Sequence, residues 1–198
     1  MNIIFDVCGV ILEWKPDQII DRYFQNDKIK RLVDIEILNH SDWKELDRGT
    51  LSKDDIVRRA SVRTGLTITE IDRMITSIPR SLLPIPETIK LINALKEKGH
   101  KLFILSNIPF MSIEYVEKEY PFFNLFEGII VSCRVNMIKP EPEIYKHLLS
   151  KYNLHTNETI FIDDSDINVN AASSLGVRSI KFNNPSQCEN ELKDIGCI

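Results

Sequence analysis

The chain has 198 residues, which suffices for one ordinary domain or for one domain with a small insert. A hydrophobic fraction of 43% supports a sizeable core, and a net charge of −4 argues against a nucleic-acid binder, because such proteins usually carry a basic face. No apolar run is long enough to span a membrane, and the first residues carry no basic segment of the kind that opens a secretory signal, so we expect a cytoplasmic protein.

The first part of the chain predicts one strand and then only helices. Residues 2–5 form a short strand-like run, and no strand pattern appears from about residue 15 to residue 83. Pro16 is suited to the start of a helix, and Gly49 to the end of one. Two further helix starts show the N-terminal capping pattern, formed by Ser52 with Asp55 and by Thr67 with Glu70. The last of these helices is expected to bury a face made of Ile68, Ile71 and Ile75.

From residue 84 onward, strand and helix patterns alternate. The predicted helices are residues 87–98, 112–119, 141–151 and 167–175, and the predicted strands are residues 101–105, 128–132, 159–162 and 179–182. This alternation predicts an α/β fold, a Rossmann-like parallel sheet with helices on both faces. We therefore expect a core domain made of residues 1–13 and 84–198, with an all-helical cap domain, residues 14–83, inserted after the first strand. Pro84 and Pro86 mark the expected hinge.

Polar side chains follow three of the predicted strands. Ligands bind at the carboxyl ends of the strands in an open parallel sheet, so these residues are expected to lie together. Carboxylates suit Mg²⁺, a hydroxyl, an amide and a lysine suit phosphate oxygens, and one carboxylate beside the phosphorus suits a nucleophile. The candidates are Asp6 after the first strand, Ser106 and Asn107 after the second, Asp163 and Asp164 after the fourth, and Lys139 on a nearby loop.

In their order along the chain, these segments resemble the four motifs of the haloacid dehalogenase (HAD) superfamily. The matching segments are Asp6-Val7-Cys8-Gly9-Val10, Leu105-Ser106-Asn107, Lys139-Pro140-Glu141 and Ile162-Asp163-Asp164-Ser165. Residues 43–49, followed by Ser52, resemble the helical cap of one subgroup. That subgroup contains β-phosphoglucomutase, the N-terminal phosphatase domain of soluble epoxide hydrolase and α-glucose-1-phosphate phosphatase.

The resemblance implies a Mg²⁺-dependent phosphatase that acts on a small phosphorylated metabolite, such as a sugar phosphate. From the charge and hydropathy we expect neither nucleic acid nor membrane as a partner, and we expect a monomer or a small homo-oligomer. The resemblance also implies that Asp6 is the nucleophile and forms an aspartyl-phosphate, and that Asp6, the Cys8 carbonyl and Asp164 hold the metal. Asp163 would act through a metal-bound water, with Asn168 behind it. Ser106 and Asn107 would bind phosphate oxygens, and Lys139 would offset the negative charge.

Cys8 departs from the pattern of the superfamily. Most of its phosphatases carry a second Asp two residues after the nucleophile, and this Asp protonates the leaving group. A thiol is a poor replacement, and general acid–base help is worth roughly 10²–10⁴-fold in rate. We therefore expect a slower enzyme or a substrate with an acidic leaving group, although relatives of α-glucose-1-phosphate phosphatase also lack this acid. Asn136 is a smaller departure, since it replaces a Gly near Lys139 but is still able to adopt a positive φ.

Two other functions are weighed against a phosphatase. Cys8 favours a degenerate, non-catalytic member that binds phosphate or a protein. A metal-independent haloacid dehalogenase is the other, but those enzymes carry Tyr at the Cys8 position and lack the acidic pair at 163–164. In the cap, Trp14 and Trp43 are candidates to stack on a substrate and Arg48 to grip a second anionic group. The alternative is that both tryptophans pack the cap core and Arg48 only ends a helix.

Overall fold

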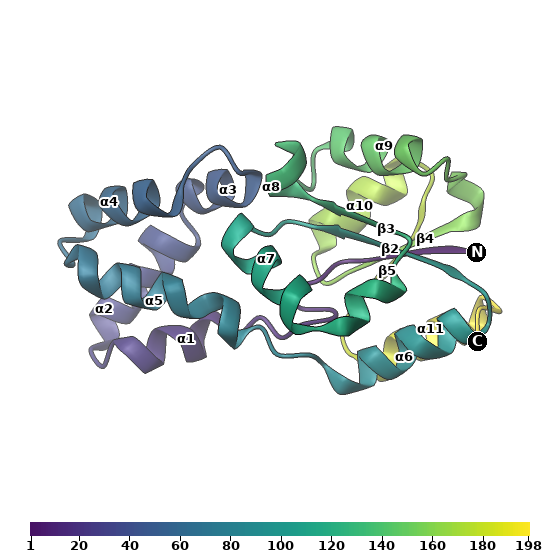
Figure 1. Ribbon diagram of the computed structural model, residues 1–198, viewed down its shortest axis with the longest axis horizontal. Coiled ribbons are helices and arrows are strands. Elements are labelled where there is room, and N and C mark those ends of the chain that lie inside the picture. Colours follow the sequence, from purple (N-terminus) through teal and green to yellow (C-terminus); the bar gives the residue numbers. More distant parts are fainter.

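A computed structural model describes residues 1–198. Its five strands form one sheet in the order β3-β2-β1-β4-β5, and every neighbouring pair is parallel (Figure 1). The strands are β1 (Asn2–Phe5), β2 (Lys101–Ser106), β3 (Gly128–Val131), β4 (Thr159–Asp163) and β5 (Arg178–Lys181). Their bounds lie within about a residue of those predicted, and the parallel sheet confirms the predicted α/β fold.

The central strand β1 sets the level at which the strands end. Phe5 pairs with Ile104 of β2 on one side and with Ile162 of β4 on the other. The next residue, Asp6, still donates its backbone N–H to the Ile162 carbonyl at 2.9 Å. The register therefore brings Asp6 and Asp163 to the same level at the carboxyl edge of the sheet.

Helices cover both faces of the sheet. Successive β1 side chains point to opposite faces, so Ile3 and Phe5 join one apolar cluster and Ile4 joins another. The first cluster includes side chains of α6, α7 and α11, and the second includes side chains of α9 and α10. The elements are α6 (Pro86–Glu97), α7 (Phe110–Glu119), α8 (Ser132–Val135), α9 (Pro142–Lys151), α10 (Asp166–Ser174) and α11 (Pro185–Asp194), with 3₁₀ turns at Pro121–Leu125 and Thr156–Glu158.

The segment between β1 and α6 is all-helical and has an apolar cluster of its own, drawn from residues 19 to 78. It lies beyond the carboxyl edge of the sheet, and both termini lie at the opposite end of the molecule (Figure 1). Its two connections to the sheet run side by side, since Ile85 donates to Ile11 and Glu13 to Leu83. Its helices are α1 (Pro16–Tyr23), α2 (Asp27–Val33), a π-helical turn (Asp34–Leu38), α3 (Ser41–Arg48), α4 (Lys53–Thr64) and α5 (Ile68–Ser81).

The local signals of this helical segment are largely confirmed. Pro16 opens α1, Gly49 ends α3 with φ +80°, and both capping patterns form. The expectation for Ile68 is wrong, because this side chain is 54% exposed. It occupies the first position of α5, before the helix reaches its neighbours, and the buried face consists of Ile71, Met74, Ile75 and Ile78. No helix of the structure has the length and apolarity that crossing a bilayer requires.

Candidate active site

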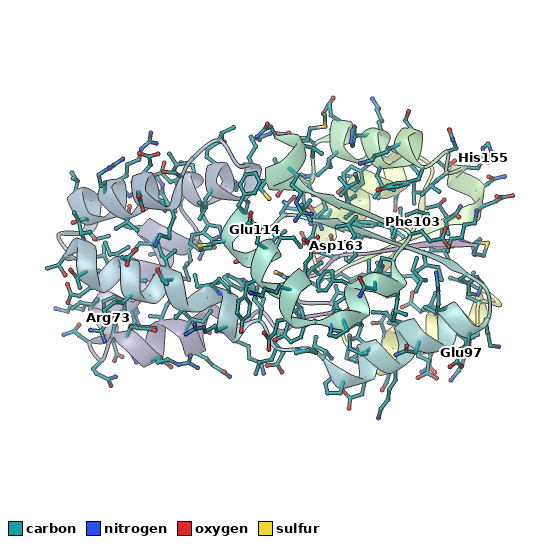
Figure 2. The ribbon with its side chains drawn as sticks, in the orientation of Figure 1. Arg73, Glu97, Phe103, Glu114, His155 and Asp163 are labelled. Atoms are coloured by element: carbon teal, nitrogen blue, oxygen red, sulfur yellow. The ribbon has the colours of Figure 1, made fainter.

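Three carboxylates and one lysine meet at the carboxyl edge of the sheet. Oxygens of Asp6, Asp163 and Asp164 lie within 4.8 Å of one another. The Lys139 side chain is fully buried, and its Nζ contacts Asp6 Oδ2 at 2.9 Å and Asp163 Oδ2 at 2.6 Å. The same Nζ also donates a hydrogen bond to the Leu105 carbonyl at 2.9 Å. Figure 2 shows Asp163 near the middle of the molecule, where the sheet meets the helical segment.

The cluster carries more negative than positive charge, since three carboxylates face a single buried ammonium. Burial, together with the charges of Asp163 and Asp164, raises the pKa of Asp6 to about 7, although Lys139 acts in the opposite direction. A divalent cation would neutralise the two excess charges, and oxygen ligands are those that Mg²⁺ prefers. The donor set therefore fits Mg²⁺.

The Cys8 carbonyl completes this set of oxygen ligands, and Gly9 leaves the space in which Asp164 approaches it. A Cβ at Gly9 would lie 2.2 Å from Asp164 Oδ2, and Gly9 has φ +85°, so only glycine lets the Asp164 carboxylate approach the loop. The Cys8 carbonyl accepts no hydrogen bond within the protein, and the Asp164 carboxylate also has no hydrogen-bond partner. Both oxygens are thus available to a ligand.

Asp163 is already engaged within the protein. Besides Lys139, its oxygens accept the Ser165 backbone N–H at 2.8 Å and Asn168 Nδ2 at 3.0 and 3.2 Å. Asn168 thus contacts Asp163 directly, and its predicted place behind a metal site stays a prediction. This engagement favours an indirect role of Asp163 at a metal over direct ligation.

The two polar residues that end β2 differ in their surroundings. The Ser106 hydroxyl is buried beside Asp6 and has no hydrogen-bond partner of good geometry, which suits an incoming oxygen ligand. The Asn107 amide instead bonds the backbone of Lys139 twice, accepting from its N–H at 2.8 Å and donating to its carbonyl at 2.9 Å. Asn107 therefore positions the loop that carries Lys139, and its predicted contact with phosphate stays a prediction.

The Cys8 thiol is poorly suited to proton transfer. Burial and the neighbouring charge of Asp6 raise its pKa well above the usual value for cysteine. The thiol therefore keeps its proton under ordinary conditions and offers no substitute for a carboxylic acid. At the other departure Asn136 adopts a positive φ of +55°, as its residue type allows, and its side chain donates to the Arg48 carbonyl at 3.1 Å.

The predicted cap residues line two adjoining cavities between the helical segment and the sheet. Trp14 and Trp43, with ring centroids 6.4 Å apart, line a largely apolar cavity of about 210 Å³. Arg48 lines the second cavity, of about 390 Å³, which also reaches Lys139. The Arg48 guanidinium is already paired with Glu141, directly before α9, at 2.8 and 2.6 Å, so it joins α3 to the sheet-bearing part of the chain.

The sequence interpretation missed Asp47. This residue lies in the last turn of α3 and lines both cavities. Burial and the charge of Asp6 raise its pKa to about 8, against the influence of Lys139. The available signal was its spacing, since Asp47 follows the buried Trp43 by four residues and thus shares its side of the helix.

Most of the chain matches a known protein family. The profile of the haloacid dehalogenase-like hydrolase family matches residues 3–182. The chain belongs to this family. It is thus a HAD-like hydrolase, as the four motifs indicated, with the parallel sheet expected of one.

Relatives of this HAD-like hydrolase include named phosphatases. It is 30% identical to sesquiterpene phosphatase astK of Aspergillus oryzae, over 98% of this chain and 96% of that protein. It is 23% identical to D-ribitol-5-phosphate phosphatase of Bacteroides thetaiotaomicron, over 96% of each chain. A solved structure of a HAD family enzyme from the same bacterium, a point mutant in complex with magnesium and inorganic phosphate, is similar with TM-score 0.72 and 25% identity, over 91% of this chain and 92% of that one.

Proposed function

We propose that this HAD-like hydrolase is a Mg²⁺-dependent phosphatase that hydrolyses phosphate monoesters of a small organic molecule. The observation that carries the proposal is the convergence of Asp6, Lys139 and an acidic pair at one sheet edge, beside an unpaired Ser106 hydroxyl. The similarity to named phosphatases and to a magnesium and phosphate complex supports it. Mg²⁺, held by Asp6, Asp164 and the Cys8 carbonyl, would supply positive charge against the phosphate.

The residues divide the chemistry among themselves. An Asp6 carboxylate oxygen attacks phosphorus, and the bond from phosphorus to the leaving oxygen breaks, giving an aspartyl-phosphate. The Ser106 hydroxyl donates to a phosphate oxygen, and the buried Lys139 ammonium holds Asp6 while it offsets the charge that gathers there. Water then attacks the aspartyl-phosphate, which releases phosphate and restores Asp6.

We further propose that residues 14–83 form a cap domain over a core of residues 1–13 and 84–198. The separate apolar cluster of the helical segment and the cavities along its boundary support this division. A cap in this place excludes water and selects the organic part of the substrate. The apolar lining of the smaller cavity, with two tryptophans and the unpaired hydroxyl of Ser112, favours a substrate with an apolar face.

Phosphate release from a panel of esters tests the proposal. The panel contains sugar phosphates, prenyl and aryl-alkyl phosphates, nucleotides and 4-nitrophenyl phosphate, each with Mg²⁺ and with EDTA. We expect release that needs Mg²⁺ and disappears in the Asp6→Asn variant. Release that persists in EDTA, or in the Asp6→Asn variant, would contradict the proposed chemistry.

Cys8 favours one other function, a non-catalytic member that binds phosphate. No release from any ester, together with Mg²⁺ binding seen by calorimetry, would point to that function. A metal-independent dehalogenase is disfavoured by the acidic cluster, because the excess negative charge of Asp6, Asp163 and Asp164 would repel a haloacid carboxylate unless a cation were bound.

A further inference from the structure

The proposed phosphatase reaction needs a proton that no residue of the core supplies. An alcohol leaves as an alkoxide unless it is protonated while its bond to phosphorus breaks, and general acid catalysis of this kind is worth roughly 10²–10⁴-fold in rate. The usual position of the acid holds Cys8, whose thiol is unsuited to this task. Lys139 is buried in contact with two carboxylates and a carbonyl.

One carboxyl group outside the core, that of Asp47, lines the same cavity as Cys8. Apart from Cys8, Asp47 is the only titratable residue that lines the smaller cavity. Its carboxyl forms no hydrogen bond and no ion pair in the structure, whereas its backbone carbonyl accepts a hydrogen bond from Ser132. Cys8 lines the same cavity as Asp47, and the charge of Asp6, two residues before Cys8, acts on both groups.

We propose that Asp47 of the cap is the general acid and base of this hydrolase, in place of the acid that Cys8 replaces. This proposal rests on the phosphatase function proposed above. It assigns a proton-transfer role to a residue of α3, in a different part of the chain from the nucleophile.

The end of α3 is held firmly over the core, which gives the Asp47 carboxyl a fixed place. The Ser132 hydroxyl donates to the Asp47 carbonyl and accepts the Ile108 N–H at 3.0 Å. Arg48 binds Glu141 with two hydrogen bonds. Gly49 packs so closely that a Cβ there would lie 2.5 Å from the Cys133 carbonyl oxygen. Three consecutive residues therefore fix the helix end, and a positioned group is what acid–base catalysis requires.

The surroundings of Asp47 favour its protonated form. Burial and the Asp6 charge raise its pKa to about 8, and Lys139 lowers it only in part. The C-terminal end of a helix also carries partial negative charge, which disfavours a carboxylate there. Both effects favour the protonated carboxyl, which is the form that a general acid needs.

The two steps balance with Asp47 in this role. In the first, Asp6 forms a bond to phosphorus, the bond from phosphorus to the alcohol oxygen breaks, and that oxygen takes the Asp47 proton. In the second, the Asp47 carboxylate accepts a proton from water while the water oxygen bonds to phosphorus and the bond to Asp6 breaks. The products are the alcohol and phosphate, and both aspartates return to their starting forms.

A matched pair of esters tests the role of Asp47. The leaving group of 2-phenylethyl phosphate is an alcohol that needs a proton, whereas that of 4-nitrophenyl phosphate is an acidic phenol that does not. Both are assayed with the full chain and Mg²⁺ by rapid mixing. In Asp47→Asn, alcohol release from the alkyl ester should fall roughly 10²–10⁴-fold. Nitrophenol should still appear in a rapid burst of one per enzyme, followed by slow turnover, because the variant also lacks the base for the second step.

The matched control is Asp54→Asn, since Asp54 is an exposed acid of the same cap that makes no hydrogen bond. It makes the same Asp-to-Asn change at an exposed position of the same segment and should leave both rates unchanged. If Asp47→Asn slows the first release of the alcohol and of nitrophenol equally, Asp47 has a structural role. If it slows neither, Asp47 has no role in the reaction. Each of these results overturns the proposal. A wild-type chain that releases no phosphate from any ester would instead refute the phosphatase function itself.

Adding an acid at position 8 gives a second, independent test. If Asp47 already supplies the proton, Cys8→Asp should accelerate alkyl ester cleavage far more in the Asp47→Asn background than in the wild type. Residues that act as a unit show such non-additivity. An equal effect of Cys8→Asp in the two backgrounds, including no effect in either, would overturn the proposal. Melting temperatures of all variants establish that each is folded.

Discussion

Lys139 offers a quantitative test of the electrostatics of the site. Its side chain has no exposure to solvent and contacts two carboxylates of the cluster. We predict that Lys139→Met, which keeps the approximate volume and removes the charge, destabilises the protein strongly. The Asp6 and Asp163 carboxylates would then lie buried without a compensating cation.

The expected size of the effect follows from this burial. Removing one partner of a buried ion pair costs about 3–5 kcal/mol, because the remaining charge stays desolvated. The protein has 198 residues, and 1 kcal/mol shifts the melting temperature of chains of this size by roughly 2–4 °C. The variant should therefore melt about 6–20 °C lower than the wild type, toward the lower end of this range because Asp6, with its pKa raised to about 7, readily takes up a proton.

The assay is thermal unfolding followed by tryptophan fluorescence, in EDTA and in excess Mg²⁺. Mg²⁺ should stabilise Lys139→Met more than the wild type, since the variant site carries one more uncompensated charge. The control is Lys193→Met, because Lys193 is half-exposed and pairs with Glu189 on the surface, where an ion pair is worth at most about 1 kcal/mol. Equal losses in the two variants would refute the reasoning.

Three further predictions concern single aspartates. Asp6→Asn should abolish phosphate release while leaving the melting temperature unchanged or higher, because it relieves repulsion among the carboxylates; retained turnover would exclude Asp6 as nucleophile. Asp164→Ala should weaken Mg²⁺ binding at least about tenfold by calorimetry, and an unchanged affinity would exclude it as a ligand. Burial alone would raise the pKa of Asp42, yet Arg63 and Arg59 hold it below its ordinary value of 3.8. The stability that this contact contributes is therefore present above pH 3.8 and is lost as the pH falls through the folded-state pKa of Asp42. When unfolding is followed from pH 7 to pH 2, Asp42→Asn should lose less stability to acid than the wild type. Equal losses of stability would contradict the assignment.

The sequence predicted the sheet, and the edge of the sheet at which the candidate residues meet, for physical reasons that act locally. Alternating strand and helix patterns determine a parallel sheet, and its register brings Asp6 level with Asp163. The capping box of Thr67 and Glu70 and the positive φ of Asn136 follow from the chemistry of single residues.

The features that the sequence did not predict depend on how the cap meets the core. Asp47 follows Trp43 by one helical turn, but only the docked position of α3 places it in the cavities that Cys8 and Lys139 also line. The partner of Arg48 is Glu141, 93 residues away, and no local pattern announces such a pair. The two bonds of Asn107 to Lys139 likewise arise from a long-range approach of two loops.

Because residues 47–49 contact the core, the end of α3 stays in place only while the cap is closed over the core. Glu141, which binds Arg48, lies two residues after Lys139 and so belongs to the loop that also neutralises Asp6. Swinging α3 outward would break this ion pair and carry the Asp47 proton donor out of the site at the same time. An open molecule could thus admit an ester, but it could not cleave an alkyl one until the cap returned. Under this arrangement a ligand that wedges apart Arg48 and Glu141 would switch off turnover from a distance, without touching the nucleophile or the metal ligands.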